Sequence, residues 1–300
     1  MNHIRICEVG PRDGLQNEKT IISAEDKIRF IELLAASGIE ELESTSFVRP
    51  GVIPQLSDAE QVFASVSHLQ ETLNLPVLVP NVKGLVRALE AGVRSVAVFT
   101  ATSNTFTQKN TNATVDESLN RIREIMSELH GTAIRVRGYI STVVDCPYEG
   151  LQDPQKSAQI AAELLEMGCF EISLGETIGT AVPSDIQRLL EAVLKIAPAD
   201  KLAGHFHDTR GTALANVMAG VDMGIRSFDA SAGGMGGCPY APGAAGNVAT
   251  EDVVYALHRS GYNTGIDLDK LCEATSFIEQ CVGRPSTSRV YQALKASALK

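Results

Sequence analysis

Short apolar runs rich in β-branched residues recur along the chain, and each is followed by a stretch with helical spacing. The eight runs lie at residues 4–10, 39–45, 75–80, 95–100, 134–142, 169–174, 202–207 and 227–232. Between them, residues 23–37, 154–167 and 184–196 place their apolar side chains at the intervals of an amphipathic helix. This alternation of strands and helices predicts an α/β fold with a parallel sheet.

The spacing of these runs favours a closed barrel. Their starts lie about 32 residues apart on average, as a (β/α)8 barrel of about 250 residues requires. The main alternative is a doubly wound open sheet, but GPRDG at 10–14 lacks the dinucleotide-binding glycine pattern after the first strand. We therefore expect a single TIM-barrel domain over residues 1–300, in which residues from about 262 form extra C-terminal helices.

Composition and net charge disfavour several classes of protein. Hydrophobic residues make up 44% of the 300 residues, tryptophan is absent and aromatic residues reach only 5%, which fits a core of Ala, Val, Ile and Leu. The formal net charge of −10 disfavours nucleic acids and anionic membranes as partners. The first residues, MNHIRICEVG, lack the pattern of a signal peptide, and the last three are not a peroxisomal signal. We expect a soluble, cytoplasmic protein.

The placement of the cysteines distinguishes one thiol from the others. The six cysteines, at 7, 146, 169, 238, 272 and 281, form no CxxC pair, so we expect reduced thiols instead of a zinc knuckle or disulfide framework. Five of them lie among core or helix residues and are predicted to be small buried hydrophobes. Cys238 instead lies within residues 232–247, whose six glycines predict a mobile loop. It is the candidate reactive thiol, and a spacer loop with an incidental cysteine is the alternative.

Two predicted strands end in residues that can hold a metal ion. In His205-Phe206-His207, at the end of the seventh run, strand alternation points both imidazoles to one face and Phe206 to the other. Asp13 follows the first run, and the carboxyl ends of all barrel strands meet at one mouth. The three side chains are therefore expected to converge there. Two hydrogen-bonded barrel histidines without a metal are the alternative.

Further polar residues are predicted to reach the same mouth. Arg12 offers a fixed cation suited to a carboxylate or enolate oxygen, although a surface ion pair would also explain it. Glu43, within ELESTSF at 41–47, is a candidate neighbour of Asp13. Asn247, at the far edge of the glycine-rich stretch, can add an amide oxygen to the metal site.

Six motifs resemble those of the 3-hydroxy-3-methylglutaryl-CoA lyase family. They are EVGPRDGLQNE at 8–18, SFVRP at 46–50, CPYEG at 146–150, EISLGETIG at 171–179, HFHDT at 205–209 and GGCPYAPGAAGNVATEDVVY at 236–255. The long glycine and cysteine stretch is specific to these lyases. The RDG and HxH elements also occur in the wider superfamily of metal-dependent TIM-barrel lyases, condensing synthases and carboxyltransferases. The similarity spans nearly the whole chain.

The resemblance implies a reaction and a role for each matching residue. The ligands of an Mg²⁺ or Mn²⁺ ion would be Asp13, His205, His207 and Asn247. Arg12 would face the nascent enolate oxygen, Glu43 would lie beside the metal, and Cys238 would be the acid/base thiol. The implied reaction is retro-Claisen cleavage of 3-hydroxy-3-methylglutaryl-CoA to acetoacetate and acetyl-CoA, with an acyl-CoA substrate and a homodimeric enzyme.

Other reactions are compatible with the same motifs. One is cleavage of a related 3-hydroxy dicarboxyl-CoA, of citramalyl type or with a longer chain. Another is a 2-isopropylmalate- or homocitrate-type condensation, although such synthases generally carry a further C-terminal domain. For the CoA moiety, the candidate residues are Lys109 and Asn110, in a polar segment at 103–112 that we expect to be an uncapped loop.

The chain departs from the family pattern at four positions near the expected mouth. Glu176 and Asp145 stand where the resemblance leads one to expect Asp and Gly. Arg210 replaces a Tyr, and Arg49 lies in a segment that usually carries a Lys-Trp pair. The two arginines add positive charge, so we expect them to influence which acyl group is preferred.

Overall fold

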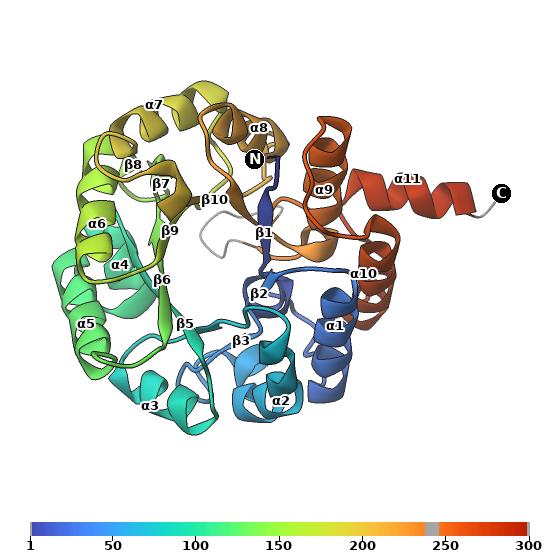
Figure 1. The fold of residues 1–300 in the computed structure, drawn as a ribbon, viewed down its shortest axis with the longest axis horizontal. Coiled ribbons are helices and arrows are strands. Elements are labelled where there is room, and N and C mark those ends of the chain that lie inside the picture. Colours follow the sequence, from blue (N-terminus) through green and yellow to red (C-terminus); the bar gives the residue numbers. More distant parts are fainter. Residues whose placement is uncertain (1, 238–245, 299–300) are drawn as a thin grey trace.

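The computed structural model describes residues 2–237 and 246–298, in which parallel strands form a ring surrounded by helices (Figure 1). This confirms the predicted TIM barrel with C-terminal helices. The barrel strands are β1 (Arg5–Glu8), β2 (Glu41–Leu42), β3 (Thr45–Ser46), β4 (Val77–Leu78), β5 (Ser95–Ala101), β6 (Arg135–Ser141), β9 (Glu171–Glu176), β10 (Leu202–Phe206) and β11 (Ser227–Ala230). A short antiparallel hairpin, β7 (Asp145–Cys146) and β8 (Gly150–Leu151), follows β6.

The second predicted run closes the ring, because it is split into β2 and β3. β2 pairs with β1 and β3 pairs with β4, both in parallel. The hydrogen-bonded order is β2-β1-β11-β10-β9-β6-β5-β4-β3. β2 and β3, which are consecutive in the sequence, therefore lie at the two ends of this order. Between them, the Glu43 N–H donates to the Glu8 carbonyl and the Ser44 N–H to the Pro76 carbonyl. One interrupted strand thus contacts both of its neighbours.

In the described part of the chain, the nine helices α1 to α9 accompany the barrel strands. They are α1 (Ala24–Ala36), α2 (Ala59–Val66), α3 (Val82–Glu90), α4 (Asn104–Thr111), α5 (Val115–Glu128), α6 (Pro154–Glu166), α7 (Pro183–Val193), α8 (Ala213–Asp222) and α9 (Thr250–Arg259). Most of them begin at a residue whose side chain accepts a hydrogen bond from the first turn of the helix. The Ser23 hydroxyl accepts from the Asp26 N–H at the start of α1, and Thr114 with Glu117 forms a capping box at α5. The predicted helices at 23–37, 154–167 and 184–196 are therefore present.

The segment 103–112 corrects one prediction. It was expected to be an uncapped loop, but residues Asn104–Thr111 form α4. The Ser103 side chain accepts from the Phe106 N–H at 3.0 Å, and Asn112 ends the helix in a left-handed conformation. Local capping at both ends therefore overrides the weak helix propensity of a polar sequence.

Two further helices, α10 (Leu268–Val282) and α11 (Arg289–Ala298), follow the last barrel unit. α10 packs beside α1 and α9, whereas α11 projects away from the ring (Figure 1). No helix in the described part of the chain is long and apolar enough to cross a membrane.

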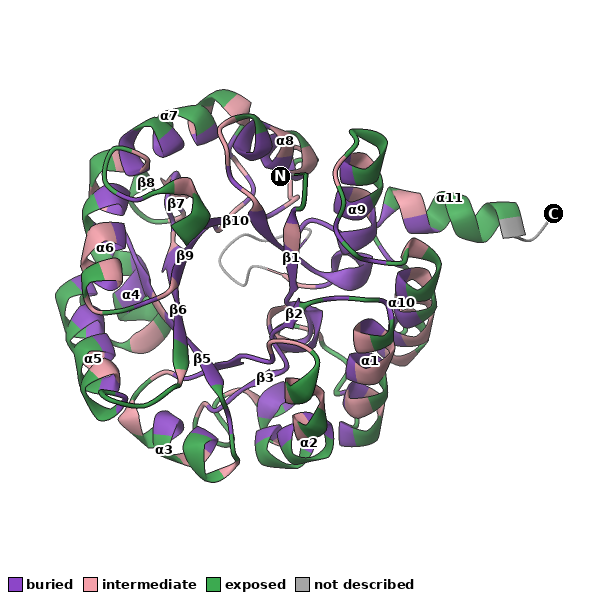
Figure 2. Ribbon diagram, in the orientation of Figure 1, coloured by how far each residue is buried: buried purple, intermediate pink, exposed green. Residues whose placement is uncertain are grey.

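The burial pattern separates the barrel wall from its interior. The strands are almost entirely buried, and the helices turn their exposed sides outward (Figure 2). Outward-facing strand residues such as Val96 and Val98 belong to the main hydrophobic core beneath the helices. The interior instead contains charged side chains, among them Arg137, Glu171 and Asp229, which are almost fully inaccessible to solvent. The polar chemistry of the molecule is therefore concentrated inside the ring.

Candidate active site

Arg12 and Asp13 lie on a single π-helical turn, η1 (Gly10–Gly14), which follows β1 directly. The Val9 carbonyl accepts from the N–H groups of both residues, at 3.2 and 2.8 Å. Such turns inside ordinary secondary structure are frequent at functional sites. The turn places two consecutive charged side chains at the carboxyl end of the first strand.

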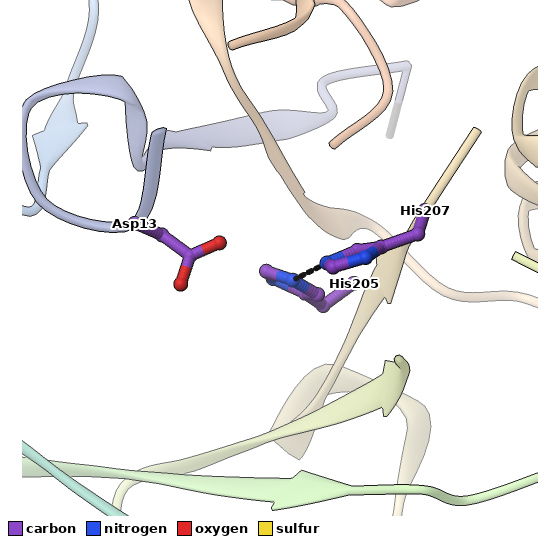
Figure 3. A group of neighbouring side chains, drawn as sticks. All are labelled: Asp13, His205 and His207. Carbon is purple, nitrogen blue, oxygen red and sulfur yellow. Dashed lines mark hydrogen bonds between the residues drawn. The ribbon is translucent and has the colours of Figure 1, made fainter. Parts of the chain in front are cut away.

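His205 lies at the carboxyl end of β10 and His207 directly follows it, and only β11 separates β10 from β1 in the ring. Their Nε2 atoms lie 3.2 Å apart, whereas Phe206 between them packs in the core against Phe228. The Asp13 carboxylate faces the two imidazoles (Figure 3), and one ligand atom from each of the three residues lies within 4.8 Å of the others. The structure thus brings together three of the four residues suggested as metal ligands, and the fourth, Asn247, lies next to Asp13.

The charge states of Asp13 and His207 fit a divalent metal ion. Burial favours the neutral form of Asp13, but Arg12 and the two histidines outweigh it and lower the pKa of Asp13 to about 2. Burial and the neighbouring His205 lower the pKa of His207 to about 4, so its ring is neutral near pH 7. Metal ions bind ionised carboxylates and neutral imidazoles. Burial opposes the charged form of His205, but its hydrogen bond to Asp229 and the charges of Asp229 and Asp13 outweigh burial and raise the pKa of His205. Asp13 and His207 are thus ready for a cation, whereas binding of an ion must displace a proton from His205.

Asn247 is held beside this group by a short extended segment. It forms an antiparallel bridge with His207, and the neighbouring Val248 N–H donates to the Phe206 carbonyl at 3.1 Å. Its amide Nδ2 donates to Asp13 Oδ2 at 2.9 Å and to the Met235 carbonyl at 3.2 Å. Turning the amide about its terminal bond would direct the oxygen toward Asp13, the orientation that metal ligation requires.

Arg12 is fixed by two carboxylates. Its Nε and Nη2 donate to Glu43 Oε2 at 2.7 and 2.6 Å, and its Nη1 donates to Asp13 Oδ1 at 2.6 Å. Burial opposes the charged form, but Glu43 and Asp13 raise the pKa of Arg12 above its ordinary value. The guanidinium also lies 5.7 Å from the centre of the Tyr139 ring. Arg12 is therefore a permanent, oriented cation next to the candidate metal ligands, and Glu43 is its anchor.

The candidate thiol, Cys238, lies outside the described residues. The five described cysteines are free thiols, as expected for reduced side chains. Cys7, Cys146 and Cys169 are buried, but Cys272 and Cys281 on α10 are only partly so, which corrects the expectation of buried side chains at those two positions. Burial raises the pKa of Cys169 and of Cys272 to about 12, which leaves both as unreactive thiols.

The candidate CoA residues lie on α4, away from the metal trio in sequence. Lys109 and Asn110 are exposed, and the Lys109 ammonium lies 4.9 Å from the centre of the Tyr148 ring. Arg49, one of the residues expected to influence acyl preference, is exposed just beyond β3.

The other departures from the family pattern brace the loop after β9. The Thr180 hydroxyl lies 2.7 Å from Asp145 Oδ2 and 3.2 Å from Glu176 Oε1, and the Thr180 N–H donates to Glu176 Oε1. Arg210 donates from Nη1 to the carbonyls of residues 178 and 179. These side chains thus support the rim of the barrel mouth.

The HMGL-like family model matches residues 3–278. The chain belongs to the HMGL-like family. Mitochondrial hydroxymethylglutaryl-CoA lyase of Arabidopsis thaliana is 50% identical over 97% of this chain, which spans 62% of that protein. The 3-hydroxy-3-isohexenylglutaryl-CoA/hydroxymethylglutaryl-CoA lyase of Pseudomonas aeruginosa is 47% identical over 98% of both chains. The crystal structure of a hydroxymethylglutaryl-CoA lyase from Pseudomonas aeruginosa aligns with a TM-score of 0.96 and 46% identity, over 99% of this chain and 98% of that one.

This HMGL-like barrel also contains site residues that sequence reasoning missed. Asp229 on β11 faces His205 Nδ1 at 3.1 Å, and its other oxygen accepts from Arg137 Nη2 at 2.7 Å. Arg137 Nη1 donates to the Tyr139 hydroxyl at 2.8 Å, and that hydroxyl lies 3.4 Å from Glu43. A buried network therefore joins His205 to the anchor of Arg12. The available signal was Asp229 itself, the one charged residue in the predicted run 227–232.

Proposed function

We propose that the protein cleaves 3-hydroxy-3-methylglutaryl-CoA to acetoacetate and acetyl-CoA in a divalent-metal-dependent retro-Claisen reaction. The observation that carries the proposal is the convergence of Asp13, His205 and His207 beside the oriented Arg12. This arrangement occurs in a chain whose close relatives are named hydroxymethylglutaryl-CoA lyases. The reaction needs a cation near negative oxygens and a donor near an enolate, and these side chains supply both.

Asp13, His205 and His207 would hold the metal ion, with Asn247 as a fourth ligand after rotation of its amide. We propose Mg²⁺ or Mn²⁺, as the family resemblance implies. When bound, the ion acts as a Lewis acid that lowers the pKa of the 3-hydroxyl group and fixes a neighbouring substrate oxygen. Asp229 keeps the proton of His205 on Nδ1 and thereby leaves Nε2 available as a ligand.

The protein side chains act on the two halves of the substrate separately. The 3-hydroxyl gives its proton to Cys238 in its thiolate form, the bond between C2 and C3 breaks as the ketone of acetoacetate forms, and the electron pair remains on C2 as the enolate of acetyl-CoA. Arg12 stabilises the enolate oxygen, since Glu43 holds the guanidinium in one orientation. Cys238 then donates a proton to C2, which completes acetyl-CoA.

Three further features stay predictions. The CoA moiety binds near Lys109 and Asn110, where a lysine beside Tyr148 offers a cation for a phosphate and a ring for stacking. The protein is cytoplasmic, and it forms a homodimer.

A second candidate substrate is favoured by one observation. The name of the Pseudomonas aeruginosa relative includes a 3-hydroxyglutaryl-CoA with a longer C3 substituent. A lyase for such a 3-hydroxy dicarboxyl-CoA would use the same metal ligands and Arg12, because only the substituent at C3 differs.

The test is product formation from a panel of thioesters. Acetyl-CoA and the matching ketoacid are measured from 3-hydroxy-3-methylglutaryl-CoA, citramalyl-CoA and a longer-chain analogue, with Mg²⁺ or Mn²⁺ and with chelator. We expect cleavage only with metal, and a loss of at least about 100-fold in Cys238→Ser and His205→Ala. Cys272→Ser on α10 is the matched control and should keep wild-type activity. If no thioester is cleaved with added metal, the proposed function is wrong.

A further inference from the structure

A small apolar cluster lies inside the barrel, separate from the main hydrophobic core. It consists of Leu78 on β4, Ala97 on β5 and Tyr139 on β6, with Phe99 of β5 packed against them. The first three side chains are buried, and Phe99 is partly exposed. We call these four residues the interior apolar wall. The interior of the ring otherwise contains several charged side chains, so a cluster of apolar side chains there is unusual.

Strand alternation fixes the direction in which the wall faces. The Thr100 hydroxyl lies 2.6 Å from the Ser118 hydroxyl on α5, so Thr100 points outward. Val98 also points outward, because it belongs to the main core beneath the helices. Phe99 and Ala97 alternate with these residues and therefore point into the barrel.

The sheet register arranges the wall in two levels. Leu78 pairs with Ala97, and Phe99 pairs with Tyr139 two residues nearer the carboxyl ends of the strands. Phe99 and Tyr139 thus stand at the level closer to the mouth, with Leu78 and Ala97 beneath them. The part of the wall that is open to a substrate is the partly exposed ring of Phe99.

The wall adjoins the candidate catalytic groups. The Tyr139 ring lies 6.2 Å from the His205 ring in an edge-on arrangement, and the Arg12 guanidinium lies 5.7 Å from the Tyr139 centroid. The Tyr139 hydroxyl accepts from Arg137, whose guanidinium also lies 5.0 Å from the centre of the ring. Tyr139 is therefore a fixed part of the wall, and Phe99 is its open part. β6 faces β1 across the ring (Figure 1), which brings the wall opposite η1. A substrate held by the metal ligands and Arg12 would therefore lie beside this wall.

The chemistry of the proposed substrate assigns an occupant to this wall. Carbon 3 of a 3-hydroxy-3-alkylglutaryl-CoA carries a hydroxyl, a carboxymethyl group, the thioester arm and an alkyl group. The first three find polar partners at the metal ligands and Arg12, but the alkyl group needs an apolar surface. We propose that the interior apolar wall receives the C3 alkyl substituent and that Phe99 limits its length. The inference rests on the proposed function.

The experiment compares C3-alkyl homologues in Phe99 variants. Values of kcat/KM are measured for 3-hydroxyglutaryl-CoA thioesters with methyl, ethyl and butyl groups at C3. Removing the Phe99 ring opens space beside Tyr139 for a longer alkyl group. In an apolar pocket, one methylene group changes the ratio of kcat/KM between two substrates by about tenfold or more. Phe99→Ala should therefore raise the butyl-to-methyl ratio of kcat/KM by at least about tenfold. Phe99→Leu, which preserves more of the packing, should raise it less.

The matched control is Val98→Ala, on the same strand but on the outward face. It also removes apolar volume from β5, so it reports any general loosening of the strand, and its butyl-to-methyl ratio should equal that of the wild type. If the wild type cleaves the methyl substrate but both Phe99 variants keep the wild-type ratio, the inference is wrong and the proposed function stands. If the wild type cleaves no homologue, the proposed function fails and the inference fails with it.

Discussion

Asp229 is not one of the three candidate metal ligands, but its hydrogen bond to His205 Nδ1 orients that imidazole. Its carboxylate accepts from the Ser173 hydroxyl at 2.7 Å, pairs with Arg137 and faces His205 Nδ1. Burial favours its neutral form, but Arg137 and His205 lower the pKa of Asp229 below its ordinary value, so the carboxylate stays ionised. An ionised partner on Nδ1 fixes the tautomer whose Nε2 can bind a metal.

Asp229→Asn is expected to weaken metal binding while the fold is retained. The amide cannot accept from His205 and Arg137 as a carboxylate does, so the affinity for Mn²⁺ should fall by about 10- to 100-fold. Free Mn²⁺, measured by electron paramagnetic resonance, gives this affinity without an activity assay. Asp222→Asn, at the exposed end of α8, is the control and should leave the affinity unchanged. Equal affinities in Asp229→Asn and wild type would refute the role of Asp229.

At the scale of elements, one buried carboxyl joins the end of β1 to two segments from the C-terminal half. Glu8 Oε1 accepts from the N–H groups of Gly10 and Ala232 at 2.7 and 2.9 Å, and Oε2 lies 2.6 Å from the Thr250 hydroxyl. These residues belong to η1, the short 3-10 turn Ala232–Gly234 and α9. Glu8 thereby holds η1, which carries Arg12 and Asp13, against the segment that leads into the glycine-rich stretch.

Glu8 should also make stability depend on pH. Burial raises the pKa of Glu8 to about 8 from an ordinary value of 4.5. The folded protein therefore binds this proton more tightly than the unfolded chain, and the resulting stability is fully present below about pH 4.5 and is lost as the pH rises through about 8. Glu8→Gln removes this contribution, so its unfolding free energy in urea should fall less than that of the wild type between about pH 5 and about pH 8. Glu25→Gln, on the exposed side of α1, is the control and should keep the wild-type pH dependence of the unfolding free energy. If Glu8→Gln also kept the wild-type pH dependence, Glu8 would not be its source.

At the scale of the whole molecule, the barrel was predictable because each unit repeats one pattern. Alternating runs and helical spacing identified the barrel strands, and the shared mouth of a barrel predicted that Asp13 and His205 would meet. Contacts between distant strands were not predictable in this way. Asp229 and Tyr139 appear in the sequence as ordinary strand residues, and their roles depend on register across β6, β9, β10 and β11. Likewise, α4 depends on capping by Ser103, which a polar composition conceals.

The two C-terminal helices should contribute unequally to stability. α10 buries Leu271, Ala274 and Ile278, whereas residues 292–297 of α11 are exposed. A chain that ends after residue 292 loses exposed residues of α11 and the ion pair of Lys295 with Glu279, which solvent screens at the exposed lysine, so its melting temperature should change little. A chain that ends after residue 267 exposes the core beneath α10 and should show no cooperative thermal transition. A cooperative transition near the wild-type temperature in this shorter chain would show that residues 1–267 fold independently.

The central claim is that Asp13, His205 and His207 hold a divalent ion required to cleave 3-hydroxy-3-methylglutaryl-CoA. Its most direct test is the initial rate of acetyl-CoA release from chelator-treated protein as Mn²⁺ is added, with bound Mn²⁺ measured in the same samples. We predict a rate that rises from near zero and saturates together with the binding of one ion per chain, and neither binding nor activity in His207→Ala. A metal-free rate equal to the rate at saturating Mn²⁺ would contradict this account.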